Sequence, residues 1–449
     1  MVKVSVVVPC LNMSRYIESC LDSIVNQTLK ELEILVVDGG SSDGTLNILE
    51  RYKRFDERVQ VLHSEKKSYG YQVNMGIARA SGQYIAIVDA DDRIANNMYE
   101  VLYDKAAASD VDYVKGSAEG FYTISDDFTY YMSLLQFPKS EYRNGTIYIE
   151  PMKSADLLAK DIYLWYGIYR QEFMKKIILH ESPGAAFQDL GGLLQTQMRA
   201  KKAIYLEKAF YQYRQDNVAS SVHNSKGFQM VWEEYTWAEQ FIRNASGTWK
   251  SAFYRKLFLH TSGTYHIMAI DGIAKESNEE YVGLIRDKLK SKLADGILKR
   301  QDFPGYEWEN LQLLLESGNG LYDKYQELFL DKKYQLIDIM KRASGKEIVI
   351  FGYGNVGMFV CAQIWKHNLG RVAAFCDNQM EKHGLIYGGV PVLSPSEAVR
   401  RYLNACFVIT STRYLEDMKR QLVAMNIPQR QICAYTEGTD MYLFGASVK

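Results

Sequence analysis

The first stretch of about ninety residues alternates four times between a short apolar run and an amphipathic or polar segment, and this limits the folds open to the chain. Unbroken apolar runs are typical of strands buried on both faces of a parallel sheet. Repeated strand–helix alternation is typical of an α/β domain whose helices cover that sheet. We therefore expect strands at 4–8, 34–37, 59–62 and 85–88, the first halted by Pro9, and helices at 15–27, 46–52 and 75–80.

The fourth apolar run ends in three acids, Asp89, Asp91 and Asp92. Carboxylates this close repel one another unless a positive charge lies among them. Ligands of open α/β sheets bind outside the carboxyl ends of the strands, where oxygen ligands suit a hard divalent cation such as Mg²⁺ or Mn²⁺. A solvated acidic loop that caps the next helix is the alternative. The cluster predicts either a metal–phosphate site or a plain acidic turn.

Polar groups also follow two other expected strands, Asn12 after the first and Asp38 after the second. Each has a structural alternative as a turn former. Because the carboxyl ends of parallel strands share one edge of a sheet, these groups and the acids after the fourth strand are expected to meet in one crevice. There Asp38 would accept from a base N–H, Asp89 would hold ribose hydroxyls, and Asp91 would hold a metal that neutralises a diphosphate.

Composition narrows the classes of partner and compartment. The formal net charge of −1 over 449 residues gives no reason to expect nucleic acid as a partner. Six cysteines without a CxxC pair are typical of reduced, mostly buried thiols, so we expect a cytoplasmic protein. The strand-like start leaves no room for a signal peptide, and no apolar run approaches the roughly 20 residues of a membrane helix. Peripheral membrane contact and homo-oligomer formation stay open.

Four segments in order carry a family resemblance. They are VSVVVPCLN, VVDGGSSDGT, NMGIARASG and DADD, at residues 4–12, 36–45, 74–82 and 89–92. Together they resemble the nucleotide-sugar-binding half of family 2 glycosyltransferases with the GT-A fold. One departure is Gly39, where the family often has a second Asp, so Asp38 is left as the carboxylate that reads the base. The resemblance implies a nucleotide-sugar site made by Pro9, Asn12, Asp38, Asn74, Asp89 and Asp91, with Asp91 holding Mn²⁺ or Mg²⁺.

The segment Gln188-Asp189 follows a Gly-containing loop and precedes an expected helix. A helix cap is the structural alternative for Asp189. Sugar transfer with inversion needs a carboxylate that takes the proton of the acceptor hydroxyl. The family carries an acidic pair, often Glu-Asp, about a hundred residues after the metal motif, and this resemblance implies that Asp189 is the base. Gln188, which replaces the Glu, is a weak candidate for the site, and Arg214 and His223, which resemble later family motifs, are weak candidates for phosphate contact.

Aromatic residues are dense between 161 and 170, and the region from 228 to 340 is rich in helix formers. Most of these aromatics are expected in the core, although some are placed to stack on an acceptor sugar. The helix formers predict a connector, a lid or an oligomer surface. Processive synthases of the family carry membrane helices and a QxxRW motif, both of which are missing from this sequence, so we expect a non-processive transferase.

Residues 346–357 open a second α/β pattern, in which Gly352, Gly354 and Gly357 form GxGxxG after an apolar run at 348–351. Such a turn before a helix suits a phosphate, and Asp377 ends the next expected strand, where a ribose-binding acid would lie. The pattern resembles small Rossmann modules found on sugar-modifying enzymes. Redox catalysis, ligand binding without chemistry and an architectural role all remain open for it.

The sequence thus predicts an α/β protein with three parts: a GT-A catalytic domain at 1–224 with a mixed, mostly parallel sheet, a helical region at 225–343, and a Rossmann-like domain at 344–449. The expected activity is inverting, metal-dependent transfer of a sugar from a nucleoside diphosphate, expected to be UDP, to a hydroxyl of a growing glycan. Two alternatives remain. One is a dehydrogenase or epimerase working through the C-terminal domain, and the other is a scaffold that binds nucleotide sugar without catalysis.

Overall fold

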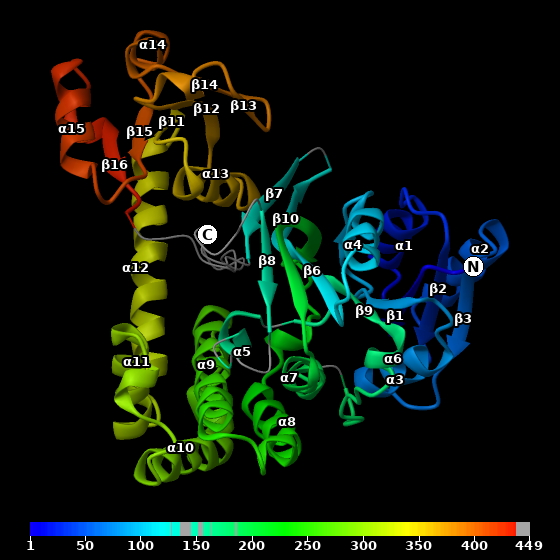
Figure 1. Ribbon diagram of the computed structural model, residues 1–449. Coiled ribbons are helices and arrows are strands. Elements are labelled where there is room, and N and C mark those ends of the chain that lie inside the picture. Colours follow the sequence, from blue (N-terminus) through cyan, green and yellow to red (C-terminus); the bar gives the residue numbers. More distant parts are fainter. Residues whose placement is uncertain are drawn as a thin grey trace. The chain divides into compact units, whose positions relative to one another are not determined.

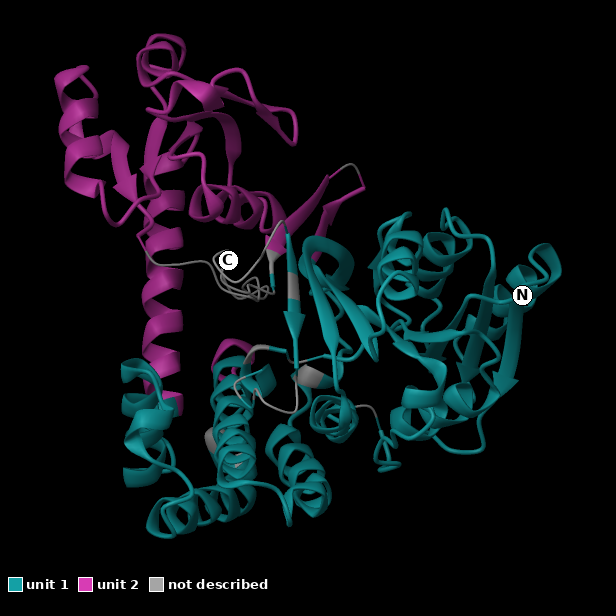
Figure 2. Ribbon diagram, in the orientation of Figure 1, with its two compact units in different colours: residues 1–120, 133–268, 273–321 teal, residues 121–132, 269–272, 322–449 magenta. Residues whose placement is uncertain are grey.

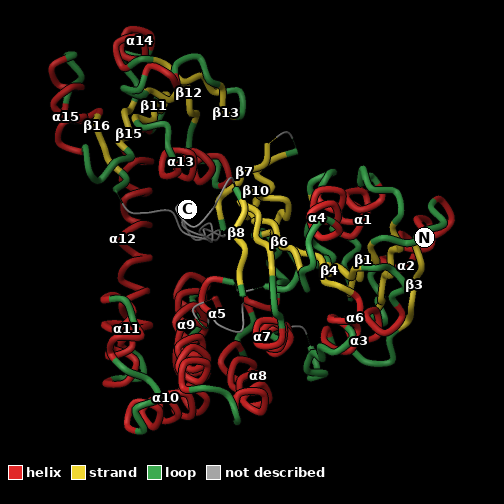
Figure 3. Tube along the Cα trace, viewed as in Figure 1, coloured by secondary structure: helices red, strands yellow, loops and turns green. Residues whose placement is uncertain are grey.

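The structure is a computed structural model that describes residues 1–126, 128–134, 145–150, 155, 157–161, 163–184 and 186–436. Figure 1 shows its elements, and Figure 3 shows how helices and strands alternate along the chain. The expected α/β class is confirmed. Within the described residues, strands form one ten-stranded sheet and one six-stranded sheet.

The N-terminal quarter forms the parallel half of the larger sheet, in the strand order β3-β2-β1-β4. Its helices lie on both faces, because the side chains of β1 alternate between two core clusters. One cluster contains residues of α1, α2 and α4, and the other contains residues of α3. The bounds are β1 Val4–Cys10, α1 Ile17–Val25, β2 Leu32–Asp38, α2 Thr45–Phe55, β3 Val59–His63, α3 Tyr69–Arg79, β4 Tyr84–Ile87 and α4 Met98–Ala107.

Two of these elements differ from expectation. Strand β1 continues through Pro9 to Cys10, because its pairing with β4 ends at Val7 and the missing N–H of Pro9 removes no bond there. Helix α3 begins six residues before the expected Met75, since the Ser68 hydroxyl accepts from the N–H of Tyr71 and caps it. The polar stretch that reads as a loop is therefore largely helical.

The second half of the sheet is mixed. Strand β9 lies antiparallel to β4 and to β6, which joins the two halves. The order continues β4-β9-β6-β10-β5, with β7 paired to β6 and β8 paired to β10. The bounds are β5 Arg93–Ile94, β6 Tyr113–Ser125, β7 Phe128–Ser133, β8 Thr146–Ile149, α5 Leu157–Lys160, β9 Gly167–Arg170, α6 Gln171–Met174, α7 Asp189–Arg199 and β10 Ala203–Arg214.

The middle region is helical, as expected. On α8, Phe228, Val231, Tyr235, Ala238 and Ile242 are buried at helical spacing, which gives one apolar face. No helix of the described residues has the length and apolar character needed to cross a bilayer. The bounds are α8 Gly227–Ile242, α9 Gly247–Asp271, α10 Glu279–Ala294, α11 Gly305–Glu316 and α12 Gly320–Ala343.

The C-terminal sheet has the order β13-β14-β12-β11-β15-β16, and all its pairs except β13–β14 are parallel. Its strand order reverses at β11, as in doubly wound sheets that bind ligands at that point. The bounds are β11 Glu347–Phe351, α13 Asn355–Lys366, β12 Arg371–Cys376, β13 Ile386–Tyr387, β14 Val390–Leu393, α14 Pro395–Arg401, β15 Cys406–Ile409, α15 Leu415–Ala424 and β16 Ile432–Ala434.

The chain divides into two compact units, coloured in Figure 2. Unit 1 contains Met1–Gly120, Ser133–Met268 and Ile273–Leu321, and unit 2 contains Phe121–Met132, Ala269–Gly272 and Tyr322–Lys449. Unit 2 thus includes the tip of the β6–β7 hairpin, where the Phe128 ring lies 4.6 Å from that of Trp365 and 5.1 Å from that of Tyr387. The three-part division at 224 and 343 stays a prediction.

Candidate active site

Three loops meet at the carboxyl edge of the parallel half-sheet. Cys10 pairs with Asp38 at the end of β1 and β2, and β4 ends just before Val88, whose N–H donates to the Val7 carbonyl. The residues that follow β1, β2 and β4 therefore share one edge. As the sequence predicts, this is the edge that carries Asn12, Asp38 and Asp89.

The first two loops are bound to each other by their own polar groups. Asn12, with φ 56°, accepts from the N–H of Ser42 at 2.9 Å. The Asp38 carboxylate is buried and accepts from the N–H groups of Gly40 at 2.9 Å and Ser41 at 3.1 Å. Pro9 is buried within β1. These contacts fix the loop shape, and contact of Pro9, Asn12 and Asp38 with a base stays a prediction.

The three acids after β4 have three different partners. The Asp89 carboxylate accepts from the Tyr69 hydroxyl at 2.9 Å, and that of Asp91 accepts from the Asn217 amide at 2.7 Å. Asp92 is fully buried and accepts from the Tyr211 hydroxyl at 2.7 Å and the N–H of Arg214 at 2.7 Å. Asp92 therefore anchors β10, whereas Asp89 and Asp91 are half-buried at the sheet edge.

These acids lie in surroundings that penalise their charge. Burial, and then the charge of Asp91, raise the pKa of the Asp89 carboxyl to about 7. Burial also raises the pKa of Asp91, against the hydrogen bond from Asn217. A carboxylate pair of this kind is stabilised by any cation that binds beside it.

Asp189 is the first residue of α7 and is half-buried. Burial raises the pKa of its carboxyl to about 6, while the positive charges of Lys256 and Lys115 lower it. The charge of Asp189 in turn raises the pKa of Asp89 and of the Tyr69 hydroxyl. The two carboxylates, a hundred positions apart in the sequence, are therefore close enough to interact electrostatically.

Two of the predicted site residues, Gln188 and Asn74, use their side chains for hydrogen bonds within the protein. Gln188 is buried, and its amide accepts from the N–H of Gly70 at 2.8 Å and donates to the Ser182 carbonyl at 2.6 Å. Asn74 accepts from the N–H of Leu179 at 3.0 Å and donates to its carbonyl at 3.0 Å. Both side chains bind α3 to the loop before α7.

The other two weak candidates lie at the end of β10, in the case of Arg214, and after it, in the case of His223. Arg214 is nearly buried and donates to the Asp91 carbonyl at 2.8 Å and to Asp216 at 3.1 Å, with its guanidinium 4.7 Å from the Tyr16 ring. It therefore supports the backbone of the acidic turn. His223 ends the short 3₁₀ helix Ser221–His223 and is half-buried. Phosphate contact by either residue stays a prediction.

Aromatic rings line the segment before β9. Tyr163 stacks on Trp165 at 4.4 Å, and Trp165 stacks on Tyr211 at 4.0 Å. Trp165 and Tyr211 are buried and Tyr163 is half-buried. After burial, the charges of Asp189, Asp92 and Asp89 raise the pKa of the Tyr163 hydroxyl, so this ring lies beside the acids.

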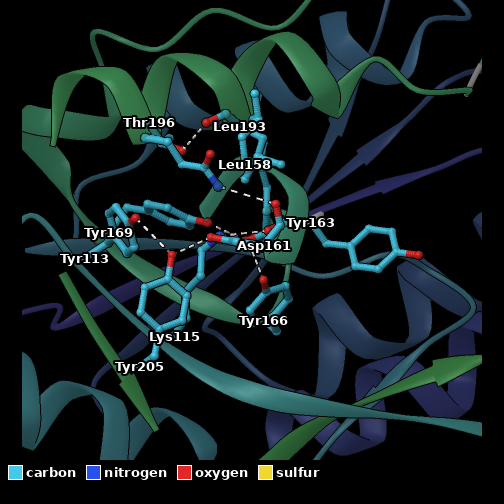
Figure 4. A network of polar contacts seen from close by, with 12 residues as sticks. Tyr113, Lys115, Leu158, Asp161, Tyr163, Tyr166, Tyr169, Leu193, Thr196 and Tyr205 are labelled. Carbon is cyan, nitrogen blue, oxygen red and sulfur yellow. Dashed lines mark hydrogen bonds and ion pairs between the residues drawn. The ribbon is translucent and has the colours of Figure 1, made fainter. Parts of the chain in front are cut away.

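A fully buried ion pair holds this segment in place (Figure 4). The ammonium of Lys115 lies 2.8 Å from Asp161, and both side chains are 0% exposed. Lys115 also donates to the Tyr163 carbonyl at 2.8 Å, and the hydroxyls of Tyr166 and Tyr205 donate to Asp161. Sequence reasoning missed this network, along with Tyr69 and Asn217, because each pair joins distant segments with no motif.

The C-terminal glycines form the expected turn. Gly352 has φ +116°, and a Cβ on Gly357 would lie 2.1 Å from the Gly352 carbonyl, so α13 packs directly on the turn. Gly354 has open space around it and lines a cavity of about 550 Å³. The Asp377 carboxylate is held by the N–H groups of Tyr353 at 2.8 Å and Gln379 at 2.9 Å. Nucleotide binding there by Gly352, Gly354, Gly357 and Asp377 stays a prediction.

Fold and site together place the chain among the GT-A glycosyltransferases. A model of glycosyl transferase family 2 matches residues 5–178. The glycosyltransferase GlyG of Streptococcus pneumoniae is 32% identical over 213 residues, which cover 47% of this chain and 70% of that protein. The chain therefore belongs to glycosyltransferase family 2, and it is an enzyme that transfers a sugar from a nucleotide sugar.

A further relative and a solved structure are also similar to this chain. The Campylobacter jejuni GalNAc(5)-diNAcBac-PP-undecaprenol beta-1,3-glucosyltransferase is 27% identical over 274 residues, covering 60% of this chain and 82% of that protein. The crystal structure of S. aureus TarS 1-349 in complex with UDP has a TM-score of 0.50 at 18% identity, covering 74% of this chain and 91% of that chain, and shows the same fold. A second family model, described as C2185-like, N-terminal, matches residues 344–433.

Proposed function

We propose that this glycosyltransferase moves a sugar from a UDP-sugar, with inversion and with a divalent cation, to a hydroxyl of a growing glycan. The observation that carries the proposal is that the first turn of α3 joins the segments of Asp89 and Asp189: the Tyr69 hydroxyl donates to Asp89, and the N–H of Gly70 donates to Gln188, which precedes Asp189. Asp89 follows β4 and Asp189 begins α7, and the charge of Asp189 raises the pKa of Asp89 and of its hydrogen-bond partner Tyr69. Inverting transfer needs a donor-side and an acceptor-side carboxylate in this relation.

Each acid has a separate task in this mechanism. Asp89 holds the ribose hydroxyls of the donor, with its carboxylate oriented by Tyr69. Asp189 accepts the proton of the acceptor hydroxyl as that oxygen attacks the anomeric carbon and the bond to the diphosphate oxygen breaks. With its pKa raised to about 6 by burial, Asp189 is ionised at neutral pH and still basic enough to take the proton.

The residues present suit a hard cation. Among the described residues no three of His, Cys, Asp and Glu are grouped for a metal, so Asp91 would hold the ion with few protein ligands. Magnesium binds in this way, through one or two carboxylates, substrate phosphates and water. When bound, Mn²⁺ or Mg²⁺ would neutralise the departing diphosphate. The Asn217 amide orients the Asp91 carboxylate for that contact.

A glycan acceptor is supported by two observations. Tyr163 is half-buried, stacks on Trp165 and feels the charges of Asp189 and Asp89, and aromatic rings of this kind stack on sugars. The Campylobacter relative is named for transfer to a lipid-linked glycan. We therefore infer a glycan or a glycosylated acceptor for this chain.

The proposal is tested by donor hydrolysis and transfer across UDP- and GDP-sugars with Mn²⁺ or after chelation. We expect turnover with a UDP-sugar, lost on chelation and in Asp91→Ala. Asp189→Asn should keep UDP binding and lose transfer. Equal loss of UDP affinity in both variants would contradict this division of roles. Donor hydrolysis by the wild type but not by Asp189→Asn would dismiss the scaffold alternative, and cofactor absorbance of the purified chain would favour the dehydrogenase.

A further inference from the structure

Lys256 of α9 is a buried lysine that the transfer chemistry above leaves unused. It is 1% exposed, and its ammonium donates to the carbonyl oxygens of Leu158 at 2.6 Å and Asp161 at 3.2 Å. No carboxylate of the described chain forms an ion pair with it. A buried ammonium is costly unless a negative charge lies nearby, so the position of Lys256 calls for a counter-charge.

The nearest carboxylate, that of Asp161, supplies only part of that charge, because it also pairs with Lys115. Both carboxylate oxygens of Asp161 accept from Lys115, at 2.9 and 2.8 Å. The hydrogen bond from Lys256 to Asp161 goes to the backbone carbonyl instead. The cluster therefore holds two lysines and one carboxylate in direct contact. One more carboxylate is needed to balance the two buried ammonium groups.

The geometry of α9 points to Asp189 as that carboxylate. His260 follows Lys256 by one helical turn, on the same face, and its ring lies 5.6 Å from that of Phe187, two residues before Asp189. Gln197, two turns along α7, donates to the same Asp161 carbonyl as Lys256. The lysine face of α9 therefore lies close both to the loop that leads into α7, whose first residue is Asp189, and to Gln197 near the end of that helix.

We propose that Lys256 is a positioning residue for sugar transfer, whose buried ammonium is the counter-charge of Asp189 and holds that carboxyl ionised. The inference rests on the proposed function, in which Asp189 is the base. It also assigns a part of the reaction to the helical region, beyond the residues 5–178 that match the family model.

Other ionisable groups face Asp189, and they do not replace Lys256. The positive charge of Lys115 is already shared with Asp161, and the charges of Glu234 on α8 and Asp89 after β4 oppose ionisation of Asp189. The remaining neighbours are phenols that stay neutral, because burial raises their pKa: Tyr69, Tyr163, Tyr169 and Tyr235. Lys256 also lowers the pKa of Asp189 more than any other charge does.

The test is the pH dependence of kcat in a matched pair of variants. Lys256→Gln removes the charge and keeps a donor for the Leu158 carbonyl, whereas Lys256→Arg keeps both. In Lys256→Gln we expect the acid limb of the profile to move to higher pH by about one unit or more, since a nearby opposite charge depresses a carboxyl pKa by that much. Lys256→Arg should keep the wild-type limb, and both variants should bind UDP.

An acid limb that stays at its wild-type pH in Lys256→Gln, with a rate lowered uniformly, would show a merely structural role and overturn the inference. If Lys256→Gln fails to bind UDP, Lys256→Met, which fills a similar volume without a charge, is the second variant. Its acid limb should also move to higher pH, and no shift would overturn the inference equally. Asp189→Asn separates the two ideas. If the acid limb of the pH profile is still present in Asp189→Asn, the proposed function is refuted. If Asp189→Asn abolishes the acid limb but Lys256→Gln leaves it at its wild-type pH, only the role of Lys256 is refuted.

Discussion

Replacing Lys115 by Met is expected to be the most destabilising single change in the buried network of unit 1. Both partners of the Lys115–Asp161 pair are fully buried and 2.8 Å apart. At an effective dielectric constant of about 20, that separation corresponds to an attraction of about 6 kcal/mol, which the cost of burying two charges offsets in part. Removing one partner of such a pair leaves the other charge uncompensated, and we expect a loss of about 3–5 kcal/mol in the free energy of unfolding.

Urea denaturation followed by tryptophan fluorescence measures this loss, with Asp161→Asn and the double variant completing a cycle. Asp161→Asn should cost less than Lys115→Met, because burial already lowers the pKa of Lys115 and the lysine can lose its proton. The double variant should cost less than the sum of the single ones, with a coupling of about 1–3 kcal/mol. The argument is that removing Lys115 leaves a buried Asp161 charge without a partner. A loss below about 1 kcal/mol in the free energy of unfolding of Lys115→Met, or additive effects in the double variant, would refute it.

Three further outcomes are expected. The wild-type transfer rate should fall about tenfold per pH unit below about pH 6, because Asp189, with its pKa raised to about 6, must be ionised to accept a proton; a flat rate down to about pH 5 would contradict this. Gly76→Ala should lower the free energy of unfolding by about 1–3 kcal/mol, since its Cβ would lie 2.3 Å from a valine methyl of β1. The control Gly283→Ala, in open space on α10, should raise it by up to about 1 kcal/mol, and thermal unfolding measures both variants. Gln188→Leu should cost about 1–3 kcal/mol by leaving the Gly70 N–H without its acceptor, and a stability equal to wild type would show that water replaces the amide.

The elements of the parallel half-sheet were predictable because strand and helix patterns are local. The apolar runs at 34–37 and 59–62 lie within β2 and β3, each of which is slightly longer. The start of α3 was not predictable from polarity. Its first turn is polar because it serves the site: Tyr69 reaches Asp89, and Gly70 lets the helix pass so close to the His180 carbonyl that a Cβ would lie 1.8 Å from it.

The different roles of the aspartates depend on contacts that cannot be read from their spacing in the sequence. Asp89, Asp91 and Asp92 look equivalent in sequence, yet Asp92 is bound by Tyr211, which lies 119 positions later. Asp38 is the last residue of β2 and Asp377 directly follows β12, where a ligand-binding acid would lie. Each carboxylate accepts a hydrogen bond from backbone N–H of its own turn. In both cases the sequence is equally consistent with a turn-forming role and with a ligand-binding role, because aspartate is suited to both.

The hairpin formed by β6 and β7 has a consequence for any attempt to shorten this enzyme. Although Phe128 comes early in the chain, it belongs to unit 2, where Gly388 leaves so little room that a Cβ there would touch both Phe128 and Trp365 at 2.7 Å. Ending the polypeptide before β11 would remove two aromatic neighbours of that ring, Trp365 and Tyr387, and would leave an apolar side chain exposed at the hairpin tip. The boundary that looks cleanest along the sequence is thus a poor place to cut, and a truncated enzyme would need Phe128 replaced by a polar residue to remain dispersed in solution.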